Sequence, residues 1–194
     1  QEEGTLSPSH SSETVSSETT TDESLNNLLS QVRTLLPQDN GNWSVYVCNL
    51  MKGTEGTIDN QPMQAASLIK LFIMGAVYEN CDQLHTIKVH CLNIFEQLCE
   101  TYDADTLNSY LNPMITVSDN DAANTLVNML GGGDDSAGMD VVNAFCQAHG
   151  YTSTSMGRLL LQDNTYGDNY TSVSDCGHFL KEIYQSNFRD SPGD

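Results

Sequence analysis

The sequence predicts an α+β fold, with a mostly helical body and an antiparallel pair of strands near the N-terminus. Three observations lead to this prediction. Apolar residues recur at helical spacing in several separate stretches, polarity alternates along residues 42–59, and 38% of the 194 residues are apolar. That apolar share is enough for one core, so we assign residues 24–194 to a single domain.

The segment before this domain differs in composition. Residues 1–23 are rich in Ser, Thr and Glu and contain no Lys or Arg. They have too little apolar surface to fold, so we expect a disordered acidic tether. Such tethers follow a removed signal or lipid anchor in exported bacterial proteins. We therefore expect an extracytoplasmic protein, secreted or tethered to the cell surface, with an ordinary disordered tail as the alternative.

Charge excludes two classes of partner. The chain has 26 acidic and 7 basic residues and a formal net charge of −19. This charge repels phosphate backbones and anionic lipid surfaces, so we expect no nucleic-acid binding and no binding to membrane surfaces. No apolar run reaches the roughly 18 residues of a transmembrane helix, and no membrane span is expected.

The first predicted helix follows the tether. Leucine and valine recur at helical spacing from residue 25 to residue 36, Asp22 or Ser24 can cap the helix, and Pro37 ends it. Residues 42–59 then predict a hairpin with its turn at 52–56, where two glycines fall. Further helices are predicted in residues 64–80, in pieces between 84 and 114, and in 118–130, 138–150 and 172–186.

Six cysteines, at positions 48, 81, 91, 99, 146 and 176, would permit disulfides in an exported protein, in any of several pairings. Several lie on apolar helical faces and fit small buried side chains equally well. A group close in sequence, which comprises Cys81, His85, His90, Cys91 and Cys99, lacks compact metal-ligand spacing. We therefore expect no metal and no other cofactor.

A serine and a lysine at the head of one apolar helix form the first candidate for catalysis. In "QAASLIKLFIMGAVYEN", Ser67 precedes Lys70 by three residues and would share its helical face. Burial and the helix N-terminus both disfavour the charged form of Lys70, and a neutral lysine can take the proton of a serine nucleophile. A plain helix cap followed by an incidental lysine explains the pair equally well.

A second polar cluster opens a later helix in "VSDNDAANTLVNML". If Ser118 faces the same pocket, its hydroxyl can pass a proton to a departing nitrogen. The Asn120 amide can hold a substrate carbonyl while it hydrogen-bonds the lysine. Ser-Asp-Asn is also a common capping sequence, so the cluster alone does not decide between the two interpretations.

Together, Ser-x-x-Lys and Ser-Asp-Asn resemble the signature of class A β-lactamases and the related penicillin-binding proteins. The resemblance covers about residues 24–186 and includes both helices, the Gly131–Gly133 break and the stretches that follow. It implies a β-lactamase/transpeptidase-like fold and a serine hydrolase that binds β-lactams or D-Ala-D-Ala peptidoglycan stems.

The resemblance also implies a role for each matching residue. Ser67 would be the acylated nucleophile, with its backbone N–H as one oxyanion donor, and Lys70 the base. Ser118 would shuttle a proton to the leaving nitrogen, Asn120 would hold the amide of the substrate, and Asn124 would support the loop beside the site.

Two departures from the family pattern modify these expectations. No glutamate lies between Glu100 and Glu182, so the loop from residue 158 to 171 offers only Asp163 and Asp168 to activate water, and we expect slow deacylation. The family's Lys-Thr-Gly and its C-terminal sheet strands are absent from this chain, whose sheet would contain the N-terminal strands alone. We therefore expect that the chain binds a complementing C-terminal fragment or associates with itself. The alternative functions are a weak class A β-lactamase and a non-catalytic binding module that retains the fold.

Overall fold

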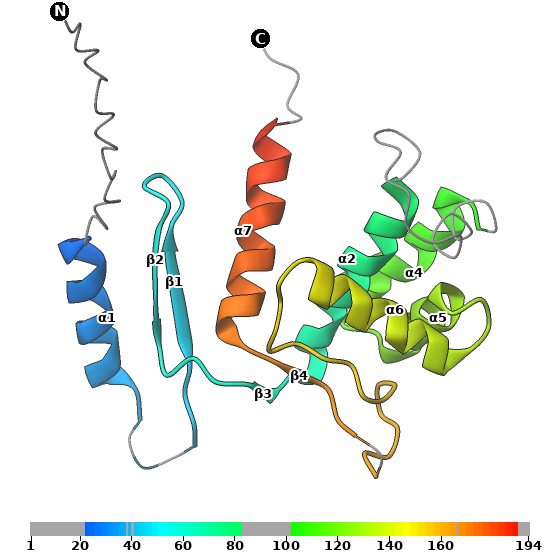
Figure 1. The fold of residues 1–194 in the computed structure, drawn as a ribbon, viewed down its shortest axis with the longest axis horizontal. Helices are drawn as coiled ribbons and strands as arrows, with labels where there is room; N and C mark the ends of the chain where they lie inside the picture. The colour runs from blue at the N-terminus through cyan, green and yellow to red at the C-terminus, as the bar shows by residue number, and fades with distance from the viewer. Residues whose placement is uncertain (1–21, 38, 40, 83–101, 166, 190–194) are drawn as a thin grey trace, which may run out of the picture.

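The structure is a computed structural model that describes residues 22–37, 39, 41–82, 102–165 and 167–189 (Figure 1). It confirms the α+β class. Its elements, in chain order, are helix α1 (Glu23–Leu35), strands β1 (Val45–Asn49), β2 (Thr54–Ile58) and β3 (Met63–Gln64), a 3₁₀ turn (Ala66–Leu68), helices α2 (Ile69–Asp82), α4 (Ala104–Thr116), α5 (Asn120–Leu130) and α6 (Asp135–Ala148), strand β4 (Tyr170–Thr171) and helix α7 (Val173–Arg189).

Helix α1 and its cap begin within the last two residues of the segment that the sequence assigned to the tether. The Asp22 carboxylate accepts hydrogen bonds from the backbone N–H groups of Ser24 and Leu25 and so caps the helix. The same carboxylate accepts from Lys52 Nζ at 3.4 Å and from Thr54 Oγ1 at 2.8 Å. One side chain therefore starts the helix and also attaches it to the hairpin.

The hairpin pairs β1 with β2 in antiparallel register, from Val45 opposite Ile58 to Asn49 opposite Thr54. Its turn lies at residues 50–53, so the prediction of a turn at 52–56 was wrong by two residues. Gly53, with φ of +69°, is in the turn, whereas Gly56 is in β2. A Cβ at Gly56 would lie 2.6 Å from the Leu29 side chain, so this glycine allows α1 to pack closely on the strand.

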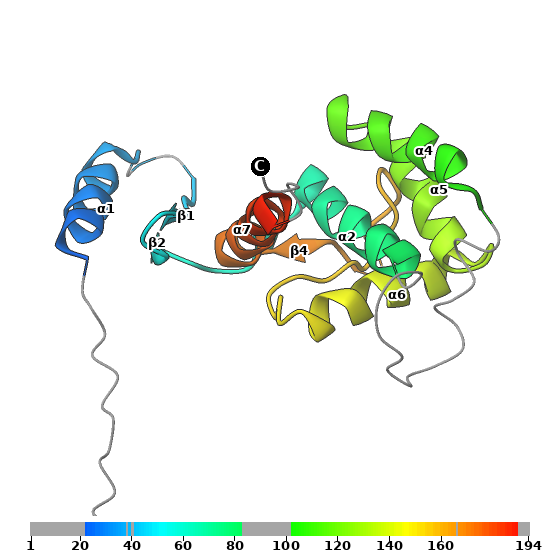
Figure 2. The same ribbon diagram turned by 90° about the horizontal axis from the view of Figure 1, so that it is seen from above.

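The helical body surrounds α2. Ile69, Phe72, Ile73 and Ala76 are buried on this helix, which packs against α4, α5 and α6. Helix α7 contacts β1, and in both views it lies between the hairpin with α1 and the other helices (Figures 1 and 2). The large apolar core is therefore in the helical part, beside the start of α2.

A second, two-stranded sheet was missed by the sequence reasoning. Strand β3 pairs antiparallel with β4, with Met63 opposite Thr171 and Gln64 opposite Tyr170. It joins the chain just before Ser67 to the end of the loop that follows α6. Two-residue strands are too short to produce an alternating pattern.

Some expectations fall on residues outside the described ranges. The tether up to residue 21 and the helical pieces predicted in residues 84–101 are among them, as are most of the Cys and His residues considered as metal ligands. Cys48, Cys146 and Cys176, which the structure does describe, are free thiols. Across the described ranges, no helix is both long and apolar enough to cross a membrane, and no three His, Cys, Asp or Glu side chains are grouped to hold a metal ion.

Candidate active site

Ser67 lies in the 3₁₀ turn between β3 and α2. The preceding residue, Ala66, has φ of +44°, in the left-handed region that non-glycine residues rarely adopt. The Ala65 N–H donates to the Asn169 carbonyl at 2.7 Å and the Leu68 N–H to the Ala65 carbonyl at 2.9 Å. These bonds fix the direction in which the chain enters α2 and turn the Ser67 side chain toward the start of α5.

Lys70 is in the first turn of α2 and only 2% of it is exposed. Its Nζ lies 3.3 Å from Ser67 Oγ, 2.6 Å from the Ser118 carbonyl oxygen, 2.9 Å from Ser118 Oγ and 2.7 Å from Asn120 Oδ1. Four oxygen atoms thus surround an amine that carries at most three protons. The two signature motifs, 48 to 50 residues apart, meet at this one nitrogen.

Ser118 and Asn120 reach Lys70 from the connection between α4 and α5. Asp119 caps α5 by accepting from the Ala122 N–H at 2.9 Å. Ser118, just before this cap, has φ of +58°, and both its carbonyl and its hydroxyl face Lys70. Its Oγ also donates to Ser67 Oγ at 2.9 Å, which closes a triangle of two hydroxyls and one amine.

Burial makes the charged form of the Lys70 amine less favourable than it is in water. Burial lowers the pKa of Lys70 from its ordinary value of 10.5, because the charged form loses its hydration, while the charge of Asp119 opposes this effect. A neutral amine can accept the Ser67 proton directly, or by way of Ser118 Oγ. The geometry therefore suits activation of a serine nucleophile by a lysine base.

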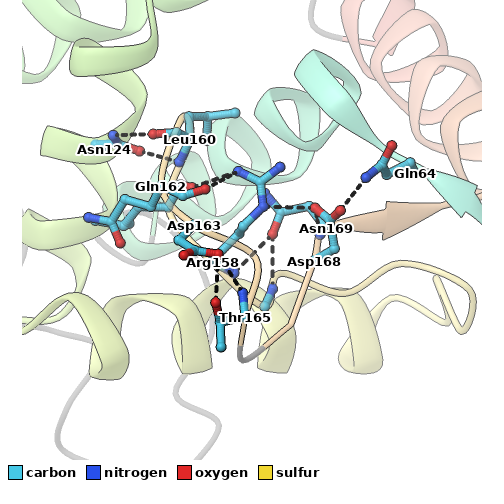
Figure 3. A network of polar contacts seen from close by, with 11 residues as sticks. Gln64, Asn124, Arg158, Leu160, Gln162, Asp163, Thr165, Asp168 and Asn169 are labelled. Carbon is cyan, nitrogen blue, oxygen red and sulfur yellow. Dashed lines mark hydrogen bonds and ion pairs between the residues drawn. The ribbon is translucent and has the colours of Figure 1, made fainter.

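Asn124 holds the loop that follows α6. Its Nδ2 donates to the Leu160 carbonyl at 3.1 Å, and its Oδ1 accepts from the Leu160 N–H at 2.8 Å (Figure 3). Asn120 and Asn124 are one turn apart on α5 and share a face. The loop segment at Leu160 therefore lies one helical turn away from the residue that contacts Lys70.

Asp163 and Asp168, the two carboxylates of this loop that could activate water, accept hydrogen bonds from other residues of the chain. Asp163 accepts from the N–H and the hydroxyl of Thr165, and these bonds lower its pKa. Asp168 accepts from Gln64, the main cause of its lowered pKa, and from Arg158 Nε at 2.9 Å (Figure 3). The stretch that Asn124 holds consists of leucines, with Leu160 buried.

Sequence reasoning missed Gln64, Arg158 and Asn169. Asn169 Oδ1 accepts from the N–H groups of Gly157 and Arg158 and closes the base of the loop. Gln64 joins that base from 104 residues away. An Arg and an Asp ten residues apart in a polar loop were the only local signal of this closure.

Sequence comparisons point to one protein family. The sequence profile of the β-lactamase enzyme family matches residues 27–89 and 97–192. A search of curated protein sequences found no significant match.

Three solved structures illustrate the similarity in fold. Penicillin-binding protein D2 of Listeria monocytogenes, solved in its ampicillin-bound form, has 16% identity and a TM-score of 0.53, over 74% of this chain and 61% of that one. The D-alanyl-D-alanine carboxypeptidase DacD of Francisella tularensis has 20% identity and a TM-score of 0.54, over 81% and 42%. Penicillin-binding protein 6B of Escherichia coli has 15% identity and a TM-score of 0.51, over 77% and 52%.

These structures share their fold with this chain, which spans less than two thirds of the length of each. The matches confirm the β-lactamase/transpeptidase-like fold that the sequence resemblance implied. Because the family profile covers well over half of the residues, the chain belongs to the β-lactamase enzyme family.

Proposed function

We propose that this chain is a serine acyl-enzyme hydrolase in which β-lactams or D-Ala-D-Ala peptidoglycan stems acylate Ser67. One observation carries the proposal. Ser67 Oγ, Ser118 Oγ and Lys70 Nζ lie within 2.9–3.3 Å of one another around a buried amine whose pKa is lowered by burial. A helix cap with an incidental lysine would not require this convergence.

The proposed acylation uses each group at a stated atom. Ser67 Oγ attacks the carbonyl carbon of the substrate, and its proton passes to Lys70 Nζ. The C–N bond then breaks, and Ser118 Oγ gives its proton to the leaving nitrogen and recovers one from Lys70. Asn120, whose Oδ1 accepts from Lys70, has its Nδ2 as a donor for the amide side chain of the substrate.

Deacylation is proposed to be slow. The loop segment held by Asn124 presents leucine and no carboxylate, and Asp163 and Asp168 bind Thr165, Arg158 and Gln64 instead. Without a positioned base, the water that frees the acyl-enzyme lacks general-base help worth roughly 10²–10⁴-fold. This favours a penicillin-binding, peptidase-like enzyme over an efficient β-lactamase. We place its action outside the cytoplasm, where peptidoglycan stems occur.

The test is a covalent adduct. We expect incubation with a labelled penicillin to add the mass of the ligand to the intact protein, and Ser67→Ala to abolish the gain. Ser30→Ala, which changes an exposed serine of α1, is the matched control and should react as the wild type does. A folded wild-type protein that forms no adduct at high ligand concentration would leave a non-catalytic binding module as the better interpretation. Rapid return to the unmodified mass would indicate a β-lactamase.

A further inference from the structure

The Gln64 side chain links the loop of residues 157–169 to the entry of the Ser67 turn. It lies on β3, three residues before Ser67, and its Nε2 donates to Oδ2 of Asp168, which stands two residues before β4 (Figure 3). We propose that Gln64 is a positioning residue, which holds the Ser67 turn in its reactive geometry through Asp168. This inference rests on the proposed function of Ser67.

The Ser67 turn needs hydrogen bonds from neighbouring segments, because its own backbone conformation is strained. Ala66 has φ of +44°, a left-handed conformation in which its Cβ crowds the main chain. Within the main chain, the 3₁₀ turn and the Ala65 N–H bond to the Asn169 carbonyl hold this residue. The Gln64 side chain adds a second attachment to the same loop end, two residues before the strained Ala66.

Asp168 is a rigid partner for Gln64. Its side chain is 8% exposed, and Oδ1 accepts from Arg158 Nε at 2.9 Å and from the Asn169 N–H at 2.8 Å. Arg158 in turn donates to the carbonyls of Leu159 and Gln162. Asp168 therefore cannot follow Gln64 if β3 shifts, and the hydrogen bond resists movement of the turn.

The consequence for the reaction is specific. Ser67 Oγ must keep its 2.9 Å and 3.3 Å distances to Ser118 Oγ and Lys70 Nζ to lose its proton, whereas ligand binding before the reaction does not require them. Loss of the Gln64 bond should therefore lower the limiting rate constant of acylation and leave the dissociation constant of the noncovalent complex unchanged.

A reciprocal exchange of side chains tests the bond directly. Gln64→Glu keeps the shape of the side chain but opposes two carboxylates. Adding Asp168→Asn restores a donor and an acceptor, because the new amide can keep its oxygen on Arg158 and the Asn169 N–H while its nitrogen donates to the new carboxylate on β3. Gln162→Leu is the control, since that exposed residue bonds within the loop through its backbone N–H and carbonyl.

Two readouts are measured on each variant: the acylation constants with a chromogenic penicillin, and hydrogen–deuterium exchange of the amides of Ala65 and Leu68 in the unliganded protein. We expect Gln64→Glu to slow acylation and speed exchange by about tenfold or more, the equilibrium factor of one hydrogen bond to a charged group. The double variant should recover to within about threefold in both readouts.

The outcomes separate the two proposals. Equal acylation and exchange in wild type and Gln64→Glu, or no recovery in the double variant, would overturn the positioning role. If wild type forms no adduct, the proposed function fails, while the exchange readout still decides whether Gln64 holds the turn. Should Gln64→Glu not fold, Gln64→Met preserves the length of the side chain and is judged by the same measurements.

Discussion

Replacement of Lys70 with methionine removes the amine and keeps most of the volume of the side chain. The structure places this amine within hydrogen-bonding distance of Ser67, Ser118 and Asn120, and the proposed mechanism uses it as the base. General-base catalysis contributes roughly 10²–10⁴-fold to a rate, or about 3–5 kcal/mol. We expect acylation of Lys70→Met by penicillin to fall by that factor.

The same replacement should affect stability less than it affects acylation. Methionine leaves the Ser118 carbonyl, Ser118 Oγ and Asn120 Oδ1 without their donor. Because Ser118 is exposed and Asn120 half-buried, water can replace part of these bonds, and each costs less than the roughly 1–3 kcal/mol of a fully buried unpaired group. It also removes a buried amine whose charged form is disfavoured, as its lowered pKa indicates, and this gain offsets part of the loss. A net cost of about 2 kcal/mol would lower Tm by roughly 4–8 °C in a domain of this size.

The assay follows adduct formation by intact mass and Tm by circular dichroism in parallel. Lys52→Met is the control, because Lys52 is 57% exposed and its ion pair with Asp22 contributes little. In wild type, acylation should rise with pH through an apparent pKa below 10.5, because the neutral amine is the base, and Lys70→Arg should lack this rise. Folded Lys70→Met that still acylates within tenfold of wild type would refute the assignment of Lys70 as the base.

Three further predictions follow from other features. Leu160→Glu puts a carboxylate on the loop segment held by Asn124 and should shorten the acyl-enzyme lifetime by about tenfold or more; an unchanged lifetime by mass spectrometry would contradict it. The cost in stability is at least about 2 kcal/mol, because Leu160 is buried and the new carboxyl loses hydration there. Lys181 and His178 lower the pKa of Glu55 to about 2 from 4.5. The Tm difference between wild type and Glu55→Gln should therefore be fully present above pH 4.5 and vanish as the pH falls toward 2. A Tm difference that stays constant with pH would argue against the contribution of these contacts. Because the net charge is −19, raising the ionic strength from about 0.01 to 0.15 M should speed acylation by an anionic penicillin severalfold and leave a neutral ester unaffected; equal salt effects on both would exclude charge repulsion.

Helices were the most predictable part of the fold. The apolar period and the polar residues before each run located α1, α5 and α7 to within a few residues, because capping is a local interaction. Helix α6 begins three residues earlier than predicted, at Asp135, since Asp134 is its cap. The glycine of β2 misled the turn prediction, because its small size serves the packing of α1, which no local pattern reveals.

The candidate site also has parts that the sequence predicts and parts that it does not. Ser67 and Lys70 are neighbours by helical spacing alone, and each motif could be found in the sequence. Their meeting with Ser118 depends on the packing of α2 against α5, and the sequence indicated it only through the family resemblance. The Gln64–Asp168 bond joins residues 104 positions apart in otherwise ordinary loop sequence, so local patterns carried no sign of it.

The left-handed backbones of Ala66 and Ser118 also bear on how this domain tolerates mutation. Each costs about 1–2 kcal/mol, against a total stability of about 5–15 kcal/mol for a typical domain. The site therefore depends on stability supplied by the adjacent core around α2, and a destabilising substitution in that core should release these two residues before the whole domain unfolds. Substitutions that remove the backbone strain at Ala66 and Ser118 would raise the stability of the domain, but they would disturb the geometry around Lys70.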